Sequence, residues 1–199
     1  MKTLSALFFI TLLLSVNTKA QNNESQLPYH EIPPYPESYS AGTVAARLID
    51  GLGFRYYWAT EGLRSEDLEY RPSEAARTTL ETLDHIYGLS QIIVNSTLRV
   101  PNDRSVEQPE LSFEEKRRMT LLNLQKASNI LKECTQEDIE QLKIIFKNGE
   151  NTSEFPFWNQ LNGPVADALW HAGQVVSFRR SSGNPINPNV SVFSGKLRK

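Results

Sequence analysis

The sequence predicts an all-α fold, an up-down four-helix bundle with a long crossover before the last helix. Four segments repeat their apolar residues with the period of an α-helix. The connections between the first three segments are short, which favours antiparallel neighbours, whereas residues 135–162 separate the third segment from the fourth. The chain has 199 residues, enough for one domain with a single hydrophobic core.

Residues 1–20 predict a signal peptide. Lys2 precedes an apolar run over residues 4–16, and the small residues of a cleavage site stand within residues 18–20, before Gln21. The apolar run is too short for a membrane span. We therefore expect a bacterial protein that is exported, either periplasmic or secreted, and that has no membrane attachment after cleavage.

The mature chain is expected to begin with an arm and to end with a tail. Residues 21–39 hold four prolines and no helical period, which predicts an extended Pro-rich arm in which His30 is solvated. The helical bundle is expected over residues 40–185, and residues 186–199 are expected to form an irregular C-terminal tail.

Capping signals set the limits of the first two helices. Ser40 is a good N-cap for a helix that runs to about Leu63. Pro72-Ser73 predicts the start of a second helix, which ends before Pro101.

The third helix is predicted from a capping box. Ser112 and Glu115 have the spacing of this motif, and the helix is expected to run to about Cys134. A short helix capped by Thr135, a strand at the sequence KIIF and a turn at residues 148–149 are alternatives that the following segment leaves open.

The fourth helix carries a polar stripe on an otherwise apolar surface. It is expected to start at the Asn-Gly-Pro of residues 162–164 and to end at Gly183, with arginines in its last turn. At about 100° per residue, Asp167, His171 and Gln174 fall on one narrow stripe. We expect a buried helix whose stripe faces an interior cleft. Because an unpaired buried carboxylate is costly, Asp167 needs a partner.

Three side chains form a candidate metal site. Asp167 and His171 offer ligands from consecutive turns, and His85 in the second helix offers a third. Two imidazoles and one carboxylate can hold a divalent cation with open coordination positions. From spacing alone, an Asp–His hydrogen bond and a satisfied core histidine are the alternatives. Glu81, one turn before His85, is a candidate orienting residue or general base, or else a solvated acid near the helix start.

Charge and cysteine content argue against several functions. The formal net charge is −2, and it becomes −4 without the two lysines of residues 1–20, which argues against nucleic acid and anionic lipid as partners. Cys134 is the only cysteine, so no intramolecular disulfide can form. Acidic neighbours raise rather than lower the pKa of a thiol, which argues against Cys134 as a nucleophile.

These motifs resemble those of the DinB/YfiT-like superfamily. In that family a histidine lies on the second helix, here in the segment DHI of residues 84–86. The last helix carries H-x-x-x-H-x-G-Q, here DALWHAGQ at residues 167–174, with Asp167 in place of the first histidine. The Arg-Pro lead-in to the second helix, within residues 69–86, is also similar. The resemblance spans roughly residues 40–185.

The resemblance implies a helical bundle that binds nickel, zinc or manganese, here through His85, Asp167 and His171. Members of the family include thiol transferases and a mycothiol-dependent maleylpyruvate isomerase. The carboxylate makes the donor set harder, which favours zinc, manganese or iron. The thiol substrates of such members are cytoplasmic, so the expected export argues against thiol transfer by this chain.

Two functions are consistent with the sequence. The first is an exported metal-dependent enzyme of hydrolase or transferase type that acts on a small molecule. The second is a non-catalytic bundle in which the metal, or an Asp–His pair, is structural and the domain binds a small molecule or a protein partner. A catalytic site requires an accessible pocket, whereas a structural site is closed by side chains. The metal, the substrate and the formation of a homodimer stay open.

Overall fold

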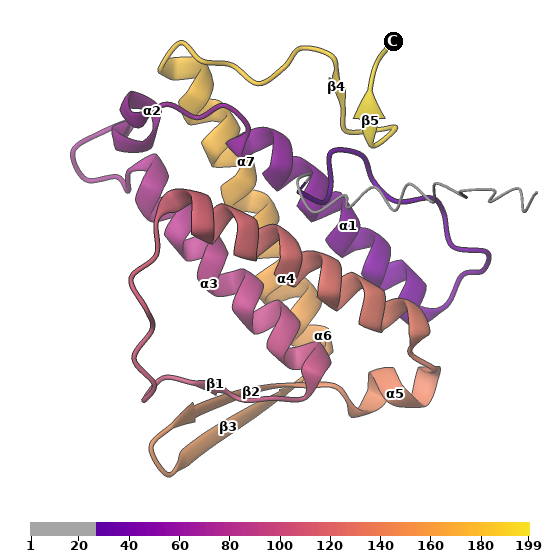
Figure 1. The fold of residues 1–199 in the computed structure, drawn as a ribbon. Coiled ribbons are helices and arrows are strands. Elements are labelled where there is room, and N and C mark those ends of the chain that lie inside the picture. Colours follow the sequence, from indigo (N-terminus) through magenta and orange to yellow (C-terminus); the bar gives the residue numbers. More distant parts are fainter. Residues whose placement is uncertain (1–26) are drawn as a thin grey trace, which may run out of the picture.

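Four long helices pack around one hydrophobic core. The computed structural model describes residues 27–199, and its long helices are α1 (Ala41–Thr60), α3 (Thr79–Leu98), α4 (Phe113–Glu133) and α7 (Ala166–Ser181). Helices α1 and α3 each pack against both α4 and α7 (Figure 1). The largest fully buried side chains are Ile49, Leu52, Phe54, Tyr56, Ile86, Ile93, Leu121, Leu124, Leu131, Leu142, Gln160 and Val165.

Local capping explains where three of the long helices begin. The hydroxyl groups of Ser40 and Ser112 accept hydrogen bonds from the third residue of α1 and of α4, as predicted. The second predicted helix instead begins after Thr78, which forms a capping box with Glu81. This corrects the predicted start at Ser73, because the residue three positions after Ser73 is an alanine and cannot complete such a box.

The structure is mostly helical, as predicted, and it also contains two small sheets. Strands β1 (Asn102–Asp103), β2 (Lys143–Asn148) and β3 (Asn151–Pro156) form one sheet, in which β2 pairs parallel with β1 and antiparallel with β3. Strands β4 (Val190–Ser191) and β5 (Lys196–Leu197) pair within the tail that was expected to be irregular. Strands of two residues are too short to leave an alternating pattern in the sequence.

The connection between α4 and α7 contains all three of the features that the sequence left open. Thr135 caps α5 (Gln136–Gln141), the sequence KIIF lies in β2, and a turn with Gly149 at φ 60° joins β2 to β3. In Figure 1 the sheet lies at the end of α3 that is opposite to α2 (Ser65–Glu69), a short helix that the sequence did not predict.

The helical segment that ends with α7 begins earlier and less regularly than predicted. Helix α6 (Trp158–Gln160) continues into a π-helical turn, η1 (Leu161–Val165), and then into α7. Asn162 therefore lies inside a helical segment rather than capping a new one. Pro164 has no N–H to donate, and Gly163 before it leaves the helical region at φ −96° and ψ −106°. The chain is kinked here, immediately before the first turn of α7.

The arm packs on α1. The buried ring of Tyr29 directs its hydroxyl to the buried carboxylate of Asp50 at 3.0 Å, and the indole N–H of Trp58 donates to the backbone carbonyl of His30 at 3.2 Å. The His30 ring lies 5.0 Å from the Trp58 ring and is half-buried, not solvated as expected.

The predicted signal peptide, residues 1–20, lies outside the described residues. None of the helices that the structure describes is long and apolar enough to cross a membrane.

Candidate metal centre

Helices α3 and α7 bring together the three candidate ligands identified in the sequence. His85 lies on α3, and Asp167 and His171 lie one turn apart on the same face of α7, which packs against α3. One donor atom from each residue lies within 4.8 Å of the donor atoms of the other two. Because 82 positions separate His85 from Asp167, tertiary packing alone brings them together.

The donor atoms fit a single cation. His85 Nε2 lies 2.9 Å from Asp167 Oδ2, and His171 Nε2 lies 3.3 Å from Asp167 Oδ1. The two imidazole rings are nearly perpendicular, at 89°, with their centroids 4.7 Å apart. Ligand atoms around a tetrahedral cation lie about 3.4 Å apart at ordinary bond lengths. The three side chains are therefore placed so that they could hold a divalent metal ion after small adjustments.

Gln174 fixes the tautomer of His171. The Oε1 atom of Gln174 lies 2.8 Å from Nδ1 of His171 and accepts a hydrogen bond from it. A neutral His171 then carries its proton on Nδ1, and the lone pair of Nε2 points toward the carboxylate of Asp167. Two electron-rich atoms facing one another at 3.3 Å repel unless a proton or a metal cation lies between them. The tautomer set by Gln174 is therefore the one that a metal ligand requires.

The three side chains line an open pocket of about 600 Å³. The loop between α2 and α3 forms one side of it, and α3 and α7 form the rest. A pocket of this volume can admit a small molecule. Its other lining residues are Pro72, Ala76, Arg77, Thr82, Gln174 and Phe178.

Solvent reaches the site. The side chains of His85 and Asp167 are 35% and 36% exposed, and that of His171 is 15% exposed. Helix α7 buries one face only, through Ala168, Ala172, Val175 and Arg179, whereas Trp170 is 71% exposed. The expectation that α7 is buried around most of its circumference is therefore wrong, since apolar side chains are often left on the surface. The geometry of the donors, not the burial of Asp167, favours a cation.

Glu81 is directed away from this cluster. Its carboxylate accepts a hydrogen bond from the backbone N–H of Thr78 at 2.7 Å, and it does not line the pocket. This bond lowers the pKa of Glu81, which weakens it as a base. Of the two roles considered for Glu81, the structure supports an exposed acid that completes a helix cap.

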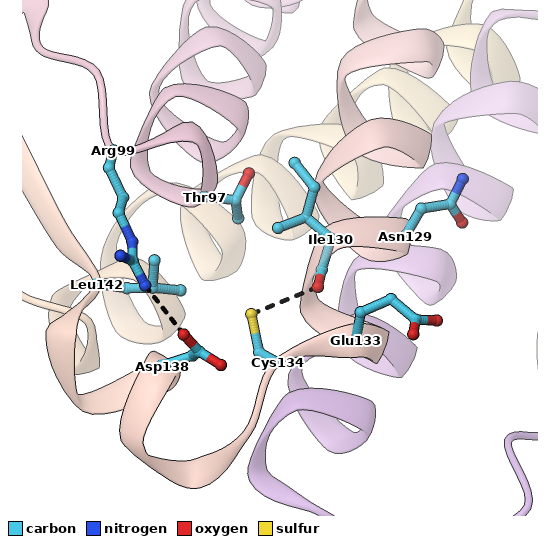
Figure 2. A pocket seen from close by; sticks show the side chains of 8 residues that line it. All are labelled: Thr97, Arg99, Asn129, Ile130, Glu133, Cys134, Asp138 and Leu142. Atoms are coloured by element: carbon cyan, nitrogen blue, oxygen red, sulfur yellow. Dashed lines mark hydrogen bonds and ion pairs between the residues drawn. The ribbon is translucent and has the colours of Figure 1, made fainter.

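A second pocket, of about 560 Å³, surrounds Cys134 (Figure 2). The thiol lies 3.4 Å from the carbonyl oxygen of Ile130, and Arg99 pairs with Asp138 at 3.2 Å. Burial raises the pKa of the Cys134 thiol, and the charge of Asp138 raises it further. The environment of Cys134 therefore disfavours the thiolate.

Comparison with known proteins supports the fold. No family model matches the sequence, and no curated protein matches it. Among solved structures, the chain is similar to that of YjoA, a DinB-like protein from Bacillus subtilis, with a TM-score of 0.53. The two sequences are 15% identical, and the match covers 75% of this chain and 99% of the other. The DinB-like fold expected from the sequence is therefore confirmed, and a fold alone does not assign a function.

Proposed function

We propose that this protein is an exported, DinB-like metal-dependent enzyme of hydrolase or transferase type. The cation would be divalent and held by His85, Asp167 and His171. The convergence of these three donors within 4.8 Å, at the wall of an open pocket, is the observation that supports the proposal most. The packing of four long helices supports the up-down bundle on which the site would be built.

The donor set suits several metals. Two imidazole nitrogens and one carboxylate bind zinc, nickel, manganese or iron, and they leave coordination positions for other ligands. When bound, such a cation acts as a Lewis acid on an oxygen of the substrate or on a water molecule. The exposure of His85 and Asp167 supports access of a substrate to that open side.

The other pocket residues would bind and orient the substrate. Among the described residues that line the pocket, Asp167 is the only acid, so no further carboxylate stands beside the ligands to take a proton. Thr82 is only 1% exposed and its hydroxyl donates to the carbonyl of Thr78 at 2.8 Å, so it offers little to a substrate. Arg77 and Gln174 supply the remaining polar groups.

A non-catalytic module is the second candidate. His85 and Asp167 are close enough, at 2.9 Å, to bond directly without a metal, so this pair could simply join α3 to α7. The pocket would then bind a small molecule or a segment of a protein partner. This candidate requires that any metal be enclosed by side chains, or that none be bound.

Access to the metal separates the two candidates. We would load the protein with cobalt(II) and add acetohydroxamate, a small metal chelator, while recording the visible absorption spectrum. A catalytic site with open positions predicts a spectral change in the wild type and in His30→Ala, a variant of the remaining histidine, but none in His171→Ala. A cobalt-loaded wild type whose spectrum does not respond would favour the structural role.

Export is a separate part of the proposal. Residues 4–16 and the cleavage motif before Gln21 support it. Expression in a bacterium, followed by fractionation and mass spectrometry, should yield a periplasmic or secreted chain that begins at Gln21. A full-length chain that stays in the cytoplasmic fraction would contradict export without affecting the metal site.

A further inference from the structure

The loop between α2 and α3 forms a wall of the site pocket. Pro72, Ala76 and Arg77 lie on this loop and line the pocket together with His85, Asp167 and His171. A backbone hydrogen bond from Thr79 to Tyr70, at 2.9 Å, closes the loop at its base. The loop is therefore held beside the candidate ligands and can contact whatever molecule they bind.

Arg77 is the only arginine or lysine among the described residues that line this pocket. Within residues 27–199, its guanidinium makes no hydrogen bond and no ion pair, and the residue is exposed. Two other arginines nearby are engaged: Arg64 pairs with Asp67 at 2.8 Å, and Arg71 donates to the carbonyl of Glu74 at 3.4 Å. Arg77 thus presents five unused N–H donors at the edge of the pocket.

The charges around Arg77 leave the pocket positive once a metal is bound. Glu81 is an acid within the electrostatic reach of Arg77, but its carboxylate caps α3 and does not line the pocket. The pocket itself contains one acid, Asp167, against the guanidinium and a divalent cation. The resulting excess of positive charge favours an anionic ligand over a neutral or cationic one.

Part of the pocket lining is apolar. Phe178 on α7 lines it, with its ring 5.9 Å from that of Tyr70 at the base of the loop. Pro72 and Ala76 add further apolar surface on the loop side. A ligand that fills this space therefore combines an apolar body with a charged end.

We propose that the pocket takes a small molecule with an oxyanionic group, a carboxylate or a phosphate, which Arg77 binds. The apolar body of the molecule lies against Pro72, Ala76 and Phe178, and its reacting group faces the three metal ligands. A planar guanidinium binds either oxyanion through two parallel hydrogen bonds, which fixes orientation as well as charge. This inference rests on the proposed function, because it takes the cation at His85, Asp167 and His171 as given.

The test compares a simple hydroxamate chelator with hydroxamates that also carry a terminal carboxylate. Acetohydroxamate binds a metal through its hydroxamate alone, whereas N-hydroxysuccinamate and its homologues with one or two more methylene groups add a terminal carboxylate. Each is titrated calorimetrically into the zinc-loaded protein and into its Arg77→Met and Arg71→Met variants. Arg71→Met is the matched control, since Arg71 lies on the same loop but does not line the pocket.

In the wild type and in Arg71→Met, the carboxylate of at least one homologue should tighten binding about five- to tenfold. In Arg77→Met this gain should disappear, while acetohydroxamate binds all three proteins equally. A gain that persists in Arg77→Met, or no gain in the wild type for any homologue, would overturn the inference and leave the metal site standing. If the wild type takes up no zinc, the proposed function fails first and the inference fails with it.

Discussion

Nδ1 of His171 lies 2.8 Å from Oε1 of Gln174, which is three residues further along α7. This contact leaves Nε2 of the same imidazole facing Asp167 and the candidate metal site. Gln174, which is not a candidate ligand, thus fixes the tautomer of His171, which is one. Such partners usually raise the basicity of a ligand and fix its ring.

Replacing Gln174 should weaken metal binding without removing it. In Gln174→Leu the Nδ1–H loses its acceptor, so the ring can rotate or adopt the other tautomer. We expect zinc affinity to fall about tenfold, measured by competition with a chromogenic chelator. Ser177→Ala is the control, because the Ser177 hydroxyl bonds only to the carbonyl of Gly173. Unchanged affinity in Gln174→Leu would mean that the contact has no part in binding.

Two consecutive arginines at the end of α7 should differ sharply in their effect on stability. The guanidinium of Arg179 is buried and donates to the carbonyls of Trp58, Ala59 and Glu61 at the end of α1. Arg179→Met leaves these acceptors unpaired, and we expect it to lower the free energy of unfolding by about 3 kcal/mol. Arg180 is exposed, so Arg180→Met should change the free energy of unfolding by less than about 0.5 kcal/mol. Urea denaturation of both variants checks this, and equal effects would contradict it.

The contact of the arm with α1 can be tested with two glycines. A methyl group at Gly53 would collide with the ring of Tyr29, whereas one at Gly88, in α3, would meet no atom within 4 Å. Gly53→Ala should therefore cost about 1–3 kcal/mol. Gly88→Ala should instead stabilise the protein by about 0.5–1 kcal/mol, through the better helix propensity of alanine. Thermal melts that show no loss in Gly53→Ala would place the arm away from α1.

Acid should destabilise the protein partly through Asp67. The buried carboxylate accepts hydrogen bonds from Arg64, Ser182 and Asn184, and these bonds, that of Arg64 first, hold its pKa far below the usual range. A depressed folded-state pKa stabilises the protein above the unfolded-state pKa of about 4, and the contribution is lost as pH falls below that value. Asp67→Asn should be less stable by about 2 kcal/mol at pH 7.

The pH series then supplies the control for Asp67. The difference in unfolding free energy between Asp67→Asn and the wild type should shrink as the pH is lowered from 7 to 3. Over this range the Asp67 carboxyl becomes protonated in the unfolded state while it stays ionised in the folded state, which lowers the stability of the wild type but not that of Asp67→Asn. A difference that stays constant over this range would show that the ionised carboxylate is not what stabilises the fold.

Local rules predicted much of the fold. Ser40 and Ser112 cap helices because a hydroxyl accepts a backbone N–H whatever the rest of the chain does. The i,i+4 spacing of Asp167 and His171 places them on one face for an equally local reason. For this reason the long helices and two of the candidate ligands could be identified from the sequence.

Features that depend on packing could not be identified in this way. The exposure of Asp167 depends on which elements cover α7, and the sequence pattern wrongly predicted burial. Ser73 and Thr78 both precede helix-forming residues, so either could have been the N-cap of the second helix. Thr78 is the N-cap because Glu81, three residues later, completes its capping box. The loop that carries Arg77 was assigned to a helix, so its place in the pocket was missed. Gln174 falls on the predicted polar stripe, but only its distance from His171 identifies it as a partner of that side chain.

The metal content of the protein tests the central claim most directly. The protein and its variants His85→Ala, His171→Ala and His30→Ala would be purified without an affinity tag and analysed by inductively coupled plasma mass spectrometry. We predict close to one divalent transition-metal ion per chain in the wild type and in His30→Ala, and almost none in the other two. Full metal content in both His85→Ala and His171→Ala would contradict a site built from these side chains.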